Sequence, residues 1–125
     1  MADASEILVI EDQASIRGNI ERLLRLECLA VLSTTGGVKG LQLARTYRPS
    51  LILCDIVMPH LDGYGVLDGL RSELLTASIS VAFLTGSADR AEREEGLRRG
   101  AAAYLIKPFD LKALLQLINR LRLEN

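Results

Sequence analysis

The sequence predicts a single α/β domain in which a five-stranded parallel sheet carries helices on both faces. Short apolar runs alternate along the chain with longer segments of helical periodicity, which is the pattern of a parallel sheet built from strand–helix units. The apolar runs are continuous, as is typical of strands buried on both faces. The chain has 125 residues without a repeat, linker or low-complexity segment, and this length suits one domain around one core.

Breaks in the pattern separate the predicted elements. Pro49 and Ser50 interrupt the chain before the third strand, and Asp62-Gly63 marks a turn before the third helix. We expect strands at residues 6–11, 28–33, 51–54, 79–84 and 102–106, and helices at residues 14–26, 37–46, 64–74, 88–99 and 110–123.

Several helix ends carry residues that suit them. Asp12 precedes the first helix and is a candidate N-cap, and Asp110 can cap the last helix in the same way. Gly100 follows Arg98-Arg99, and a glycine after basic residues is typical of a helix C-terminus.

The last two predicted helices differ in their polar patterns. The fourth carries opposite charges four residues apart, which stabilise an exposed helix locally: Asp89/Arg93, Glu94/Arg98 and Glu95/Arg99. The last has an apolar stripe that we expect in the core: Leu111, Leu114, Leu115, Ile118 and Leu121. Leu117 lies at the margin of this stripe and Leu123 off it. We interpret both as residues of a frayed end, with a partner surface on this helix as the alternative.

Composition excludes several classes of protein. The chain is 49% hydrophobic and 25% charged, as is ordinary for a globular domain. A net charge of −1 argues against nucleic-acid binding by the chain as a whole, and the apolar runs are too short to span a bilayer. With no signal-peptide character at the N-terminus, we expect a cytoplasmic protein. Cys28 and Cys54 both fall in predicted strands, where we expect buried, reduced thiols.

Polar side chains follow four of the predicted strands at the point where each ends: Glu11 and Asp12, Asp55, Thr85, and Lys107. All strands of an open parallel sheet have their carboxyl ends on one edge, and ligands bind along that edge. The fold class therefore predicts that these five side chains meet in one pocket.

Three carboxylates in a partly buried pocket repel one another, so a shared proton or a cation must neutralise them. Oxygen ligands on rigid strand ends suit Mg²⁺, which favours carboxylates together with a phosphate oxygen. A phosphoryl group here would meet Mg²⁺, the Lys107 ammonium and a hydrogen bond from Thr85, which are the parts needed for phosphoryl transfer. A carboxylate can be the covalent acceptor, giving an aspartyl phosphate.

The chain resembles the receiver domain of two-component response regulators over essentially its whole length, residues 1–125. The resemblance implies a flavodoxin-like, doubly wound (βα)5 domain with strand order 2-1-3-4-5. Four motif-bearing segments carry it, in order and at family-like spacing: Ile7–Gln13, Leu53–Gly63, Phe83–Ser87 and Gly100–Phe109.

Position by position, the resemblance assigns roles at the pocket. Asp55 matches the phosphorylated aspartate, and Glu11 and Asp12 match the acidic pair that binds Mg²⁺ directly or through water. Val57 matches the position whose backbone carbonyl completes the metal shell.

Other matches concern the response to phosphorylation. Thr85 matches the switch hydroxyl, Lys107 the catalytic lysine and Tyr104 the switch aromatic residue. The Lys107-Pro108 bond matches one that is typically cis in the family.

The resemblance also implies partners. A sensor histidine kinase or a histidine phosphotransfer protein would phosphorylate Asp55, and the surface of the fourth helix, fifth strand and fifth helix would then control a downstream partner or domain. The chain would be a signalling domain that catalyses only its own phosphorylation and dephosphorylation, without direct nucleic-acid or membrane binding. Where a charged dimer contact occurs in winged-helix regulators, this chain has Ala102-Ala103, so a homodimer would rest on apolar contacts.

Three alternatives are weaker. A haloacid dehalogenase resembles this pattern but needs a second aspartate where Val57 stands. A receiver-like binding module that is never phosphorylated would be expected to lose an acid or the lysine. A dinucleotide-binding loop at Gly36-Gly37 would require glycine in place of Thr35.

Overall fold

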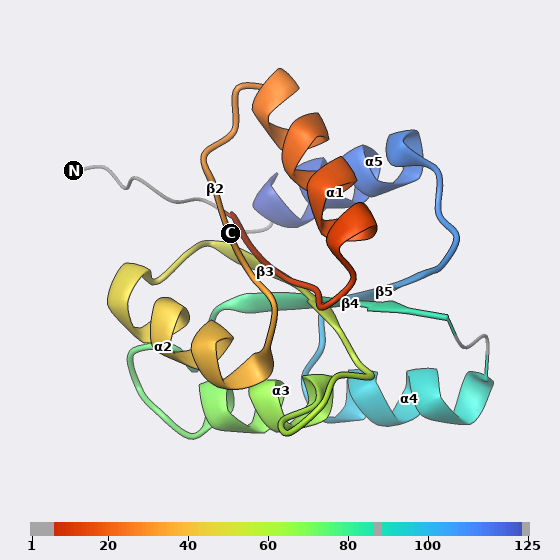
Figure 1. Cartoon of the computed structure of the whole chain (residues 1–125). Helices are drawn as coiled ribbons and strands as arrows, with labels where there is room; N and C mark the ends of the chain where they lie inside the picture. The colour runs from red at the N-terminus through yellow and green to blue at the C-terminus, as the bar shows by residue number, and fades with distance from the viewer. Residues whose placement is uncertain (1–6, 87–88, 124–125) are drawn as a thin grey trace.

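The computed structural model describes residues 7–86 and 89–123, and it shows one sheet between two layers of helices (Figure 1). All strand pairs are parallel, and the order is β2-β1-β3-β4-β5, which confirms the predicted fold class and strand order. The strands are β1 (Ile7–Ile10), β2 (Val31–Thr34), β3 (Leu51–Asp55), β4 (Ser80–Thr85) and β5 (Ala103–Ile106). The helices are α1 (Ala14–Leu26), α2 (Gly37–Tyr47), α3 (Gly63–Arg71), α4 (Arg90–Arg98) and α5 (Leu111–Leu123).

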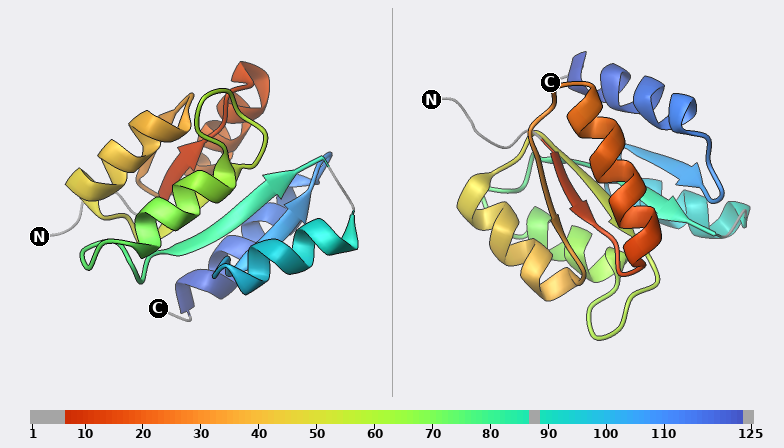
Figure 2. Two further views of the ribbon diagram at one scale, coloured as in Figure 1. Left: turned by 90° about the horizontal axis from the view of Figure 1, so that it is seen from below. Right: turned by 45° about the horizontal axis from the view of Figure 1, so that its top comes forward.

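The sheet is buried on both faces because successive residues of each central strand point to opposite helix layers. Ile7 and Val9 pack with the buried side chains of α1 and α5, whereas Leu8 and Ile10 pack with those of α2 and α3. Figure 2 shows α1 and α5 covering one face and α2, α3 and α4 covering the other. Both faces are therefore apolar, and polar side chains are confined to the strand ends.

Side-chain caps begin three of the helices. The Asp62 carboxylate accepts a hydrogen bond from the Gly65 amide (2.9 Å), and Asp89 accepts one from Ala91 (2.8 Å). Asp110 accepts one from Ala113 (2.8 Å), as predicted. The prediction for Asp12 was wrong: Gln13 occupies the N-cap position of α1 without a side-chain cap.

The second predicted strand began too early, and Cys28 is not in it. Cys28 is exposed and has φ of 60°, because it ends α1 in the left-handed conformation. The Cys28 amide donates to the Arg25 carbonyl (3.0 Å) and the Leu29 amide to the Leu24 carbonyl (2.9 Å), which is the Schellman pattern of helix ends. Only Cys54 is the buried thiol that the sequence predicted.

The charged and apolar patterns of α4 and α5 are confirmed in part. Glu95 pairs with Arg99 as predicted, while Arg98 pairs with Glu95 and Arg90 with Glu94. In α5, Leu117 is buried although it was assigned to the margin, and Leu111 is 42% exposed although it was assigned to the core. Leu111 lies in the first turn, where it borders a groove against α1 instead of the sheet. Leu123's side chain and residues 6 and 88 lie outside the described part of the chain.

Two glycines on helices have opposite surroundings, and this predicts opposite effects of alanine. Gly18 in α1 has no neighbour within 4 Å of an added Cβ, so Gly18→Ala should raise the free energy of unfolding by about 1 kcal/mol. At Gly40 in α2, an added Cβ would lie 2.4 Å from Cδ1 of the buried Ile10. Gly40→Ala should therefore lower the free energy of unfolding by about 1–3 kcal/mol. Urea denaturation of both variants measures the difference, and equal effects would contradict the packing described.

Candidate functional site

The polar residues at the strand ends meet at one edge of the sheet, as the sequence predicted. Asp55 and Thr85 are the last residues of β3 and β4, and Glu11 and Lys107 directly follow β1 and β5. The register places Ile10 beside Cys54 and Thr85 beside Ile106, so these residues leave neighbouring strands at the same level. Glu11, Asp55 and Thr85 are buried, and Asp12 lies beside them in an exposed position.

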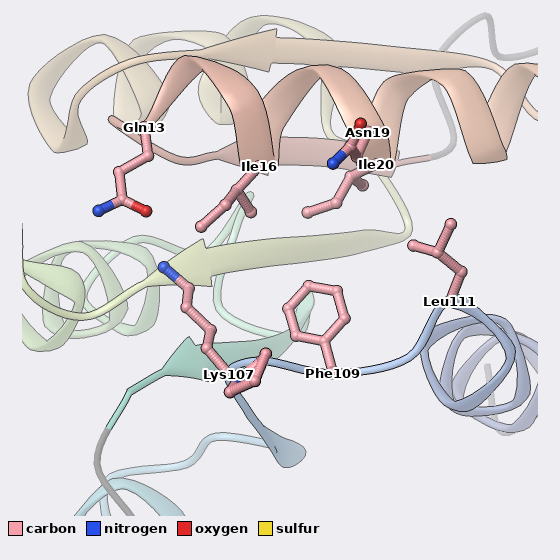
Figure 3. A pocket seen from close by; sticks show the side chains of 8 residues that line it. Gln13, Ile16, Asn19, Ile20, Lys107, Phe109 and Leu111 are labelled. Carbon is pink, nitrogen blue, oxygen red and sulfur yellow. The ribbon is translucent and has the colours of Figure 1, made fainter.

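Lys107 bridges two of the carboxylates. Its Nζ lies 2.9 Å from Oε1 of Glu11, which is fully buried, and 3.4 Å from Oδ1 of Asp55. Figure 3 shows the Lys107 side chain extending from the end of β5 towards the start of α1. An ammonium between two buried carboxylates offsets part of the free energy that their desolvation costs.

Backbone contacts hold the lysine and the glutamate in place. The Lys107 amide donates to the Thr85 carbonyl (2.7 Å), and the bond from Lys107 to Pro108 is cis, as the resemblance implied. The Glu11 carboxylate accepts a hydrogen bond from the Gln13 amide (3.2 Å), and its carbonyl accepts one from Arg17 Nη1 (2.9 Å). These hydrogen bonds position the backbone of both residues and one carboxylate oxygen of Glu11.

The environment of Asp55 disfavours its ionised form. Burial first, and then the neighbouring charge of Glu11, raise the pKa of Asp55 to about 6, although Lys107 acts in the opposite direction. This is the expected balance where a carboxylate is desolvated beside a like charge. Near neutral pH the site therefore carries unfavourable negative charge that a cation would relieve.

The acidic cluster fits a divalent cation. Carboxylate oxygens of Glu11, Asp12 and Asp55 lie within 4.8 Å of one another. The Lys107 ammonium contacts two of these three carboxylates, so two negative charges remain in the cluster when all three are ionised. Hard oxygen donors in this number, with an exposed side open to water, match the preference of Mg²⁺ for a few carboxylates together with water and phosphate oxygens.

Two further predicted positions border the cluster. Val57 follows the end of β3, and its side chain is 79% exposed, so a metal ligand at this position would have to be its backbone carbonyl. Cys54 packs in the core, as predicted for a buried thiol, and its Sγ donates to the Asp55 carbonyl at 3.1 Å. Burial raises the pKa of that thiol, so Cys54 is a neutral packing residue and not a second nucleophile.

Sequence reasoning missed the role of Gly63, which it treated only as part of a turn. An added Cβ at Gly63 would lie 2.6 Å from the Asp55 carbonyl oxygen, and the Gly63 amide donates to the Ile56 carbonyl at 2.8 Å. The start of α3 therefore packs directly on the backbone that carries Asp55. The glycine in the Asp62-Gly63 pair was the available signal, but a turn alone also explains it.

Tyr104, predicted as a switch residue, lies away from the acidic cluster, on the face that β5 shares with α4. Its ring packs edge-on against Phe83 of β4 (centroids 5.4 Å apart), and its hydroxyl donates to the Glu92 carbonyl at 2.9 Å. Phe83 lies two residues before Thr85, so β4 joins the pocket to the tyrosine.

Comparison with known proteins agrees with this fold. The family described as the response regulator receiver domain matches residues 7–119. The chain is 39% identical over 109 residues to the probable transcriptional regulator ycf27 of Porphyridium aerugineum, covering 87% of this chain and 44% of that protein. It is 34% identical over 115 residues to the DNA-binding dual master transcriptional regulator RpaA of Synechocystis, covering 92% and 48% respectively.

Solved structures give the same result. The chemotaxis protein CheY4 of Vibrio cholerae superposes with a TM-score of 0.89 at 26% identity, covering 96% of this chain and 99% of that one. The receiver domain of the sensor histidine kinase PA1611 from Pseudomonas aeruginosa superposes with a TM-score of 0.85 at 31% identity, covering 95% and 97%. That structure has a magnesium ion coordinated in its active-site cleft.

The family match, the relatives and the superposed structures all point to one class of protein, the signalling receivers. The chain belongs to the response regulator receiver family and is a receiver domain of two-component signalling. It spans about half the length of the transcriptional regulators it matches. None of the helices within residues 7–86 and 89–123 combines the length and apolar character needed to cross a membrane.

The raised pKa of Asp55 predicts how Asp55→Asn changes stability in metal-free protein. Between about pH 4 and pH 6 the folded chain keeps a proton that the unfolded chain, with a carboxyl pKa of 3.8, has released. The contribution of Asp55 to the free energy of unfolding therefore falls as pH rises through this window. Above pH 6, Asp55→Asn should be more stable than the parent chain by on the order of 1 kcal/mol, and the gain should vanish towards pH 4.

Urea denaturation in chelator across this pH range measures the gain. Asp68→Asn, at an exposed carboxylate on α3, is the matched control and should lack this pH-dependent gain. A loss of stability in Asp55→Asn at pH 7 would contradict the electrostatic description of the site.

Proposed function

We propose that Asp55 accepts a phosphoryl group from a phosphohistidine of a sensor histidine kinase or a histidine phosphotransfer protein. The observation that carries this proposal is the position of the Asp55 carboxylate, 3.4 Å from the Lys107 ammonium and within 4.8 Å of the Glu11 and Asp12 carboxylates. The ammonium can stabilise charge on a transferring phosphoryl group, and the carboxylates can hold its metal ion.

In the transfer step, a carboxylate oxygen of Asp55 attacks phosphorus as the bond from phosphorus to the histidine nitrogen breaks, and the imidazole leaves. Glu11, Asp12 and Asp55, with the backbone carbonyl of Val57, would hold Mg²⁺. Mg²⁺ supplies charge neutralisation for the phosphoryl oxygens. Lys107 would bind a phosphoryl oxygen while it remains paired with Glu11.

An apolar groove beside this pocket offers a place for the phosphodonor protein. It has a volume of about 450 Å³ and lies between α1 and the segment that follows β5 (Figure 3). Lys107 closes one end of the groove, while Ile16, Phe109 and Leu111 provide apolar contacts. A helix that presents its histidine at the Lys107 end would bury apolar surface as it delivers the phosphoryl group.

Phosphorylation would be read at the surface of α4, β5 and α5. The Thr85 hydroxyl would move towards the new phosphoryl oxygens, and Tyr104 would follow on the neighbouring strand. A second groove of about 370 Å³ lies on this surface, with Arg93, Leu97 and Arg120 among its lining residues. A downstream partner or domain binding there would sense the position of Tyr104, as a two-state element biased by one local charge change.

The remaining parts of the proposal concern the whole chain. Residues 1–125 form one receiver domain that acts in the cytoplasm, hydrolyses its own acyl phosphate and performs no other enzymatic step. It contacts neither nucleic acid nor membrane directly, so control of transcription in a longer protein would belong to another domain. A homodimer would use apolar contacts near Ala102-Ala103, where neither residue carries charge.

The proposed phosphoacceptor can be tested by intact-mass measurement. Incubation with acetyl phosphate and Mg²⁺ should add one phosphoryl group, because Asp55 lies beside both the metal ligands and Lys107. Chelation of Mg²⁺ should strongly reduce the modified fraction. Asp55→Asn should remain unmodified, and the exposed Asp68→Asn should be modified like the parent chain.

Full modification of Asp55→Asn would overturn the assignment of the acceptor. No modification of the parent chain by acetyl phosphate or by a phosphorylated histidine phosphotransfer protein would instead favour a binding module that is never phosphorylated.

Lys107→Met should destabilise the metal-free chain, because it leaves the buried carboxylates of Glu11 and Asp55 without their ammonium. Breaking a buried ion pair by removing one partner predicts a loss of about 3 kcal/mol in the free energy of unfolding. Millimolar Mg²⁺ should restore part of the lost free energy of unfolding, since a cation would again lie beside the carboxylates of Glu11 and Asp55. Urea denaturation with and without Mg²⁺ measures both effects. Lys39→Met, at an exposed lysine of α2, is the control, and equal stability of the two variants would refute the prediction.

A further inference from the structure

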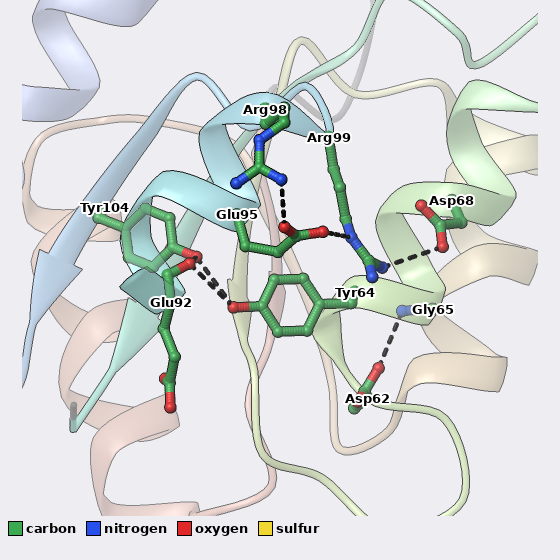
Figure 4. A network of polar contacts seen from close by, with 9 residues as sticks. All are labelled: Asp62, Tyr64, Gly65, Asp68, Glu92, Glu95, Arg98, Arg99 and Tyr104. Carbon is green, nitrogen blue, oxygen red and sulfur yellow. Dashed lines mark hydrogen bonds and ion pairs between the residues drawn. The ribbon is translucent and has the colours of Figure 1, made fainter. Parts of the chain in front are cut away.

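Two tyrosine hydroxyls share one backbone carbonyl on α4 (Figure 4). The Tyr104 hydroxyl lies 2.9 Å from the Glu92 carbonyl oxygen, and the Tyr64 hydroxyl lies 3.2 Å from the same atom. The two hydroxyl oxygens are 3.2 Å apart. This three-oxygen cluster joins α3, α4 and β5, elements that are far apart in the sequence.

The hydroxyls of Tyr64 and Tyr104 can each donate one hydrogen bond, whereas the cluster has three oxygen–oxygen contacts. The shortest contact indicates that Tyr104 donates to the Glu92 carbonyl, which leaves Tyr64 to donate to that carbonyl or to the Tyr104 oxygen. Burial first, and then the hydrogen bond with Tyr64, raise the pKa of the Tyr104 phenol, so the Tyr104 hydroxyl remains a neutral donor at physiological pH. Tyr64 therefore supplies Tyr104 with a second hydrogen-bonding partner.

The ring of Tyr64 is itself held from both sides. It packs edge-on against Phe83 with centroids 5.4 Å apart, as Tyr104 does on the same phenylalanine. The Arg99 guanidinium lies 5.0 Å from the centroid of the Tyr64 ring, a favourable arrangement of a cation over an aromatic face. Arg99 is held in turn by Glu95 (2.7 Å) and Asp68 (3.3 Å), so the Tyr64 hydroxyl is presented from a fixed position.

Gly96 makes the room that Tyr104 occupies. It lies one turn after Glu92, on the same side of α4. An added Cβ at Gly96 would lie 2.1 Å from the Tyr104 hydroxyl oxygen and 2.7 Å from a ring carbon of Tyr104. Even an alanine at this position would therefore compete with the observed position of the tyrosine ring.

Tyr64 also stands next to the pocket. It directly follows Gly63, which packs on the backbone of Asp55. Tyr104 is thus connected to the acidic pocket through α3 and Tyr64 as well as through β4 and Thr85.

We propose that Tyr64 is a positioning residue that holds Tyr104 inward against the notch at Gly96, and that it does so in the metal-free, unphosphorylated chain. The inward and outward positions of Tyr104 form a two-state element that Tyr64 biases towards the inward one. The consequence for signalling rests on the proposed function: phosphorylation of Asp55 would act on a tyrosine that is already biased inward. The hydroxyl cluster itself does not depend on phosphorylation.

The test uses NMR of the full chain in chelator and without a phosphodonor, so its result does not depend on whether Asp55 is an acceptor. The chain has three tyrosines, and Tyr47, which is half exposed, serves as an internal reference. The parent chain should show a strong nuclear Overhauser effect between the Tyr104 ring and Gly96 Hα. Photochemically induced nuclear polarisation by a flavin dye should be weak at Tyr104 and strong at Tyr47.

Tyr64→Phe keeps the ring and removes the hydroxyl, and it should lower the inward-to-outward ratio of Tyr104 about five-fold, as expected for one lost hydrogen bond. The Overhauser effect should weaken and the polarisation of Tyr104 should rise. Gly96→Ala should abolish the Overhauser effect and expose the Tyr104 ring. Alanine favours the helix itself, so α4 should remain folded in this variant. Tyr47→Phe, the matched control, should change neither.

Two results would overturn the proposal. One is a Tyr104 ring that is as strongly polarised as Tyr47 in the parent chain. The other is a Tyr104 ring whose Overhauser effect and polarisation are unchanged by Tyr64→Phe, whatever the effect of Gly96→Ala. Failure of Asp55 to accept a phosphoryl group would leave these signals as they are and would count only against the proposed function.

Discussion

The repulsion among carboxylates at the carboxyl edge of the sheet is the constraint on which the rest of the site depends. Glu11 and Asp55 are buried, and the Lys107 ammonium contacts both carboxylates. One positive charge does not neutralise two, so the net charge of the three groups is negative when both acids are ionised. Burial beside a like charge costs free energy, which appears in the raised pKa of Asp55. The same excess charge would be relieved by a cation bound at this edge.

The surrounding fold keeps these charges together although they repel one another. The strands that carry them are buried on both faces, so their ends cannot separate without exposing apolar side chains. Gly63 lets α3 pack on the backbone of Asp55, and the backbone bond from Lys107 to Thr85 joins the ends of β4 and β5. Packing of the apolar core therefore offsets the loss of stability caused by the repelling charges at the edge. Such a cost is common at functional sites.

The resemblance to the receiver family supplied the sheet order. The chain order of short apolar runs and polar strand ends was enough to predict the fold class and four elements of the site: the acidic pair, Asp55, Thr85 and Lys107. Each of these follows from local sequence, because strand ends of a parallel sheet share one edge. Predictions that depended on the path of the backbone between elements were less accurate. Cys28 ends a helix instead of entering a strand, and Asp12 does not cap α1, because a carboxylate beside a helix start can as well face the pocket.

The sequence by itself determined which side chains gather at the sheet edge, since burial on both strand faces leaves polar groups no other place. Only the tertiary structure decided how α3, α4 and β5 pack around Tyr104. Tyr64, Gly96 and Tyr104 lie on three elements, and no spacing or periodicity connects a hydroxyl on α3 with a missing Cβ on α4. Their contact depends on how two helices pack across one phenylalanine of the sheet, which is a property of three-dimensional packing and not of local sequence.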